Sequence, residues 1–109
     1  MNAGSSPDIG ADLQGFVIPI TEPPVVEIDT EATAAYIRLR DTAVARAEPY
    51  GSANGLVMID YDADGNVVGI EFVGQQEFSI RELIKLVPAQ TSSSILDRTR
   101  YIVANLQAA

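Results

Sequence analysis

The order of apolar and polar residues predicts that the chain begins with strands and ends with helices. Residues 34–40, AAYIRLR, alternate strictly, so Ala35, Ile37 and Leu39 face one side of a strand. Two further segments rich in β-formers flank an acidic turn, a pattern typical of a hairpin. The predicted strands cover residues 25–29, 34–40, 44–48, 56–61 and 67–73.

Helical spacing replaces this alternation near residue 79. Ser79 and Glu82 match a capping box, in which both side chains bond backbone amides at the start of a helix. The apolar residues that follow at helical spacing are Ile80, Leu83, Ile84 and Val87. Pro88 then ends the first predicted helix.

A second stripe with helical spacing lies in the C-terminal part of the chain. Its members are Ile95, Thr99, Ile102, Val103 and Leu106. This stripe predicts a helix from residue 94 to about residue 106. The expected fold class is therefore α+β, an antiparallel β-meander of about five strands followed by two α-helices.

Composition divides the chain into three parts. Residues 1–15 are small, polar and acidic, and residues 16–20, FVIPI, fit either a short edge strand or an apolar anchor. We predict a mobile N-terminal arm over residues 1–24 and a core domain over residues 25–88. A linker and the amphipathic helix occupy residues 89–109.

The chain of 109 residues contains neither cysteine nor histidine. These absences remove disulfides, thiolate nucleophiles, the usual zinc sites and the commonest general base at neutral pH. Asp60 and Glu71 would need a cleft between them for acid–base chemistry, and a short meander offers none. We therefore expect a protein without catalytic activity and without a cofactor.

A formal net charge of −8 repels nucleic-acid phosphates, so nucleic-acid binding is not expected. No apolar run approaches the roughly 18 residues of a membrane span. Residues 1–24 lack the basic start and continuous apolar stretch of a secretory signal. We expect a cytoplasmic protein, with no membrane contact, that binds a second copy of itself or a basic protein.

Residues 60–71, DYDADGNVVGIE, resemble a calcium-binding loop. Asp60, Asp62, Asp64 and Glu71 stand where an EF-hand has ligands. An EF-hand requires a helix on each side of its loop, whereas both flanking segments here are rich in β-formers. A hairpin whose turn contains Gly65 at positive φ accounts for the same residues.

The predicted register of this hairpin argues against a shared metal ion. We expect Ile59 to pair with Val68 and Glu71 to lie opposite Leu56, because the apolar residues then fall together. Glu71 would lie four positions from Asp60, about 13 Å along the strand. These carboxylates are therefore predicted to form no metal site.

Three segments together resemble domain of unknown function 2283, a family of small prokaryotic proteins. They are EIDTEATAAYIRLR (27–40), VARAE (44–48) and IDYDADGNVVGIEF (59–72). The resemblance covers residues 25–73 and implies a small β-meander with helical decoration and no established activity. Some members look like an antitoxin-like acidic partner of a small protein encoded nearby, which implies a protein–protein interaction.

Tyr36, Arg38 and Arg40 share one face of the second predicted strand, and two interpretations remain open. The three side chains fit a binding stripe for a small anion or a nucleotide. They also fit charge pairing with acids such as Glu27 and Asp29 on a neighbouring strand.

The C-terminal stripe provides the candidate contacts with a protein partner, Ile95, Ile102, Val103 and Leu106. It can pack on the sheet of its own chain or on another chain. The expected function is that of a small, acidic, non-enzymatic interaction protein. The alternative is a small-anion or nucleotide-binding module that uses the Tyr36, Arg38 and Arg40 face.

Millimolar calcium should leave the melting temperature unchanged, because a hairpin does not bring the acids of residues 60–71 around one ion. Thermal denaturation with calcium chloride, against magnesium chloride at equal ionic strength, measures this. A saturable rise of several degrees with calcium alone would restore the EF-hand interpretation.

Overall fold

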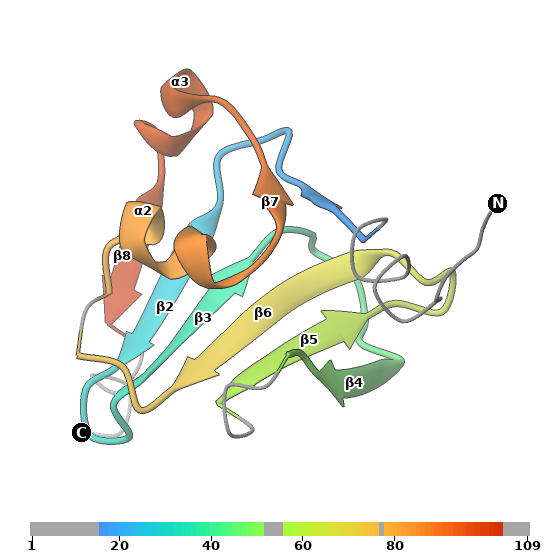
Figure 1. Cartoon of the computed structure of the whole chain (residues 1–109), viewed down its shortest axis with the longest axis horizontal. Coiled ribbons are helices and arrows are strands. Elements are labelled where there is room, and N and C mark those ends of the chain that lie inside the picture. Colours follow the sequence, from blue (N-terminus) through green and yellow to red (C-terminus); the bar gives the residue numbers. More distant parts are fainter. Residues whose placement is uncertain (1–15, 52–55, 77, 104–109) are drawn as a thin grey trace, which may run out of the picture.

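The computed structural model describes residues 16–51, 56–76 and 78–103, and within them the chain is mostly β (Figure 1). Six strands form one mixed sheet with the order β4-β5-β6-β3-β2-β8. Its members are β2 (Val25–Asp29), β3 (Ala34–Arg38), β4 (Arg46–Pro49), β5 (Val57–Tyr61), β6 (Val67–Val73) and β8 (Arg100–Val103). Neighbouring strands are antiparallel except β2 and β8, which run parallel. The α+β class with mostly antiparallel strands is therefore confirmed, whereas the expected five-strand meander is wrong, because β3 pairs with β6 instead of β4 and β8 adds a sixth strand.

Two short helices near the C-terminus accompany the sheet. The first, α2 (Ile80–Leu83), continues into the 3₁₀ turn η1 (Ile84–Leu86), and the second is α3 (Ser93–Leu96). A separate two-stranded sheet pairs β1 (Ile18–Pro19) in parallel with β7 (Ala89–Gln90). Helix α2 and strand β7 lie over one face of the large sheet (Figure 1). No helix among the described residues is long and apolar enough to cross a membrane.

The core lies between this covered face and the segments packed on it. Val26, Ile37, Ile70 and Ile59 form one row across four neighbouring strands, and all four are buried. The buried side chains that cover the sheet include Ile18, Ile80, Leu83, Val87 and Leu96. Burying each such side chain contributes about 1.5–3 kcal/mol, before chain entropy is counted.

The FVIPI segment is both a short strand and an apolar anchor. Ile18 and Ile20 are buried, and their amides donate to the carbonyls of Pro88 (3.0 Å) and Gln90 (2.9 Å). Residues 16–24 of the expected N-terminal arm are therefore attached to the core. Residues 1–15 of that arm lie outside the described part of the chain.

The first predicted helix is confirmed in part, since α2 has four residues, continues as the 3₁₀ turn η1 and has no side-chain cap hydrogen bond at Ser79. The prediction of a second helix to about residue 106 is wrong. Helix α3 covers only four residues, with the Ser92 side chain accepting from the Ile95 amide. Residues 100–103 instead form β8 beside β2, and the Arg100 amide donates to the Pro24 carbonyl (3.1 Å). β-Branched and aromatic residues such as those of RYIV favour strands over helices. The side of β2 away from β3 provides backbone groups with which these residues form hydrogen bonds. Leu106 lies outside the described residues.

The β5–β6 hairpin is confirmed, but its predicted register is wrong by two residues. Ile59 pairs with Ile70 rather than Val68, and Glu71 lies opposite Met58 rather than Leu56. The Asp62 amide donates to the Asn66 carbonyl and closes the turn. A bulge lies just before the turn, between Asp60 and Tyr61. An even shift leaves each side chain on its predicted face, so the apolar residues still meet.

Gly65→Val should lower the free energy of unfolding by about 1 kcal/mol or more, because Gly65 has a φ of +86° that valine rarely adopts. Urea denaturation measures the loss. Ala63→Val is the matched control, since it adds the same side chain to an exposed position of the same turn. Equal effects of the two substitutions would contradict this explanation.

Candidate functional site

The sheet face opposite the core carries a polar network centred on β3. The Tyr36 hydroxyl donates to Asp60 Oδ2 (2.9 Å) across β6. Arg38 donates from Nε and Nη2 to the two carboxylate oxygens of Glu27 on β2 (2.8 and 3.3 Å). Four side chains from β2, β3 and β5 are thereby joined on one surface.

Gly69 on β6 makes this network possible. It lies in register between Arg38 and Asp60, and it is buried. A Cβ atom built at Gly69 would overlap the phenol ring of Tyr36. The absence of a side chain therefore lets Tyr36 lie across the backbone and reach Asp60. The same ring lies 5.2 Å from the Arg38 guanidinium carbon, within cation–π range.

The surroundings of Tyr36 and Arg38 favour the protonated form of both side chains. Partial burial and then the bond to Asp60 raise the pKa of Tyr36, so its hydroxyl stays protonated and remains a donor. The hydrogen bond to Glu27 raises the pKa of Arg38. The polar groups of Tyr36 and Arg38 are thus engaged within the chain, as the charge-pairing interpretation expects.

Arg40 does not belong to this network. The strand ends at Arg38, where the amides of Leu39 and Arg40 both donate to the Val68 carbonyl (2.8 and 3.1 Å). Arg40 instead lines a cleft of about 480 Å³ together with Phe16 and Asp41. The predicted stripe is therefore divided, with Arg40 at this cleft and Tyr36 and Arg38 in the network on the outer face.

The acids of the hairpin also serve local structure. Asp62 Oδ1 accepts from the amides of Asp64 and Asn66, both at 2.9 Å, and the bond from Asn66 lowers the pKa of Asp62. Asp60 is bound by Tyr36, while Glu71 is exposed on the outer face. Asp60 lies opposite Gly69, so Glu71 is two positions away along the strand instead of the four that were predicted. Within the described ranges no three potential metal-binding side chains gather together.

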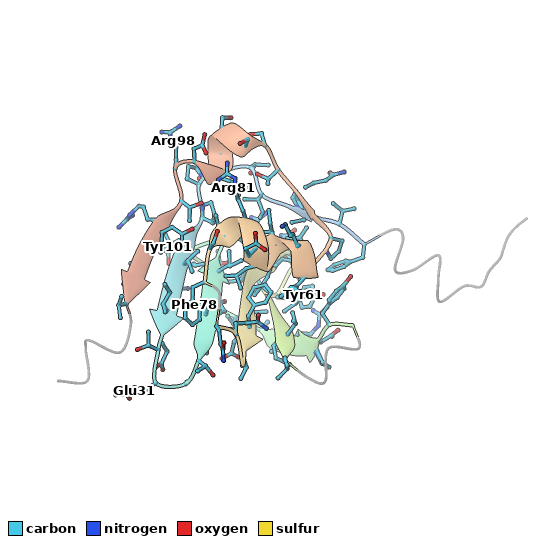
Figure 2. All side chains as sticks on the ribbon, turned by 60° about the vertical axis from the view of Figure 1, so that its left-hand side comes forward. Glu31, Tyr61, Phe78, Arg81, Arg98 and Tyr101 are labelled. Carbon is cyan, nitrogen blue, oxygen red and sulfur yellow. The ribbon has the colours of Figure 1, made fainter. Side chains whose placement is uncertain are left out.

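The C-terminal contact residues occupy two elements instead of one helix face. Ile95 is half-buried on α3, whereas Ile102 and Val103 lie on β8 and are 40% and 39% exposed. Tyr101 is 49% exposed, and its hydroxyl accepts from the Ile80 amide (2.9 Å; Figure 2). The sequence interpretation missed Tyr101, although RYIV carries a strand signal.

The strands that hold the network, β2 to β6 with the acidic turn between the last two, also carry the family resemblance. Residues 26–74 match the DUF2283 family. That family is described as a protein of unknown function, and the resemblance expected from the sequence is confirmed. No curated protein and no solved structure matches the chain. The DUF2283 segment ends after β6, so the two helices and β8 lie beyond it.

Gly69→Ala should lower the free energy of unfolding by about 1–3 kcal/mol, because the new methyl group would displace the Tyr36 ring. Urea denaturation measures the effect. In a Tyr36→Ala background the same change should be neutral or stabilising, since alanine is favoured over glycine in a strand. Equal losses in both backgrounds would show that the ring does not cause the effect.

Proposed function

We propose that this chain is a non-enzymatic interaction protein that binds other protein chains. The observation that carries this proposal is the outer strand β8, whose Tyr101, Ile102 and Val103 are consecutive and exposed. Exposed apolar residues on an edge strand are typical of surfaces that pair with another chain. They lie outside the DUF2283 segment, so they extend the family core with a contact surface.

The distribution of charge supports a basic protein as one class of partner. Among the described residues, four of the seven basic side chains form ion pairs, Arg38, Arg46, Arg81 and Lys85. Glu31, Asp64 and Glu71 are among the acids that have no ion pair in the part of the chain that the structure describes. Excess negative charge accelerates encounter with a basic surface.

A small-anion module is the second candidate, and it is favoured by Arg40 in the cleft of about 480 Å³. This volume lies within the range of small-molecule sites. However, Glu22 and Asp41 line the same cleft, and they oppose the binding of an anion. Inorganic phosphate that raises the melting temperature in the wild type but not in Arg40→Ala would favour this candidate.

The basic product of an adjacent gene should bind with an affinity that falls about tenfold or more between about 50 mM and about 500 mM salt. Isothermal titration calorimetry measures this binding. The triple variant Glu31→Gln/Asp64→Asn/Glu71→Gln should bind more weakly, because it removes carboxylates without ion pairs. Salt-independent binding, or none, would contradict a basic partner.

A matched triple variant controls for net charge. Glu48→Gln/Glu82→Gln/Asp97→Asn also neutralises three acids, but each of these is paired with a base within the chain. It should retain more of the affinity than the first variant. Equal losses would show that only total charge matters and that the free carboxylates have no special role.

A further inference from the structure

We infer that β8 pairs with β8 of a second copy in antiparallel orientation, which joins two six-stranded sheets into one continuous sheet. This inference rests on the proposed function and names one of its partners. Strand β8 is the last strand at its side of the sheet among the described residues (Figure 1). An edge of this kind leaves backbone donors and acceptors available for another strand.

The direction of these backbone groups follows from the pairing with β2. In a parallel ladder, alternate residues direct both their amide and their carbonyl to the neighbouring strand. The Arg100 amide donates to Pro24 of the β2 side, so Arg100 and Ile102 face β2. Tyr101 and Val103 therefore direct their amides and carbonyls outward.

The outward backbone groups of one copy are complementary to those of a second copy. A two-fold axis at Ile102 places Tyr101 of each copy opposite Val103 of the other, in the hydrogen-bonded type of antiparallel pair. Both residues of such a pair donate and accept, so four main-chain hydrogen bonds form across the axis. The exposed side chains of Tyr101, Ile102 and Val103 then lie against their counterparts and lose contact with water.

Charge is also complementary in this register. The β8 end at Arg100 lies toward α3, whereas the end at Val103 lies near the β2–β3 turn with Asp29 and Glu31. Figure 2 shows Arg98 beside α3 and Glu31 at the opposite end of the molecule. Antiparallel pairing brings the basic end of one copy to the acidic end of the other, twice by symmetry.

One specific ion pair follows from this arrangement. Arg100 of the second copy comes to the Val103 end of β8 of the first, on the same sheet face as Asp29 of the first. The two backbones are then about two strand spacings apart, roughly 10 Å, which an arginine side chain largely spans. Arg100 has no ion pair within the described residues of its own chain.

The opposite edge of the sheet is less suited to such pairing. Strand β4, RAEP, contains Pro49 and the ion pair between Arg46 and Glu48, and all four residues are exposed. Proline and charge are the features that keep edge strands from pairing. A dimer through β8 is therefore favoured over a chain of copies joined at both edges.

The test uses the full chain and two proline variants. The contact comprises few residues, whereas stable complexes bury about 1,200–2,000 Å², so we expect a concentration-dependent dimer. Sedimentation velocity over a range of concentrations measures its dissociation constant. Val103→Pro removes one outward amide per copy and should raise that constant about tenfold or more. Ala47→Pro places proline at an outward amide of β4 and should leave it unchanged.

A second pair of variants tests the charge contact. Arg100→Ala should raise the dissociation constant about two- to tenfold, because two exposed ion pairs are lost. Arg46→Ala removes an arginine from the opposite edge and should have no effect. Equal effects of Arg100→Ala and Arg46→Ala would overturn the predicted contact with Asp29.

Amide hydrogen exchange of the wild type keeps the inference testable if Val103→Pro does not fold. The Tyr101 and Val103 amides should exchange more slowly as the concentration rises, while the Ala47 amide should not change. A monomer at every concentration, protection independent of concentration, or a dimer protected elsewhere would overturn the inference. A monomer that still binds the basic protein would leave the proposed function intact.

Discussion

The pairing of β6 with β3 on one side and β5 on the other is the interaction on which the rest of the structure depends. Val68, Ile70 and Phe72 of β6 are completely buried, and the intervening residues face the opposite side of the sheet. The core and the polar network therefore share one strand. A shift of one residue would exchange the two faces and place charged groups in the core.

This constraint explains how far the sequence could predict the fold. Alternation identified the faces of β3, β5 and β6, because side chains of a strand must alternate. It could not identify the register, since the five-residue turn and the bulge beside Tyr61 together moved the partner of Ile59 by two positions. Any even shift preserves the pattern of apolar residues, so the pattern alone cannot distinguish the two registers.

The C-terminal part shows a different limit of sequence interpretation. Ile95, Ile102 and Val103 have helical spacing, yet Ile102 and Val103 belong to a strand. The helix prediction counted apolar positions and gave too little weight to the β preference of these residues. The decisive contact, with β2, joins residues more than 70 positions apart, and local patterns contain no information on such a partner. The end of β3 shows the same limit, since the strand ends at Arg38 although the alternation continues to Arg40.

The two faces and the edge of this sheet divide the chemistry of the protein between them. On the outer face, the Tyr36 hydroxyl is bonded to Asp60 and the Arg38 guanidinium is paired with Glu27. Binding a ligand there would first require breaking hydrogen bonds that fold stability also uses. Pairing at the β8 edge does not require this, because its outward backbone groups would exchange hydrogen bonds with water for hydrogen bonds with a partner strand. If the proposed interactions hold, the acids would govern the rate of association with a basic partner, whereas the apolar edge would govern the strength of a contact at β8.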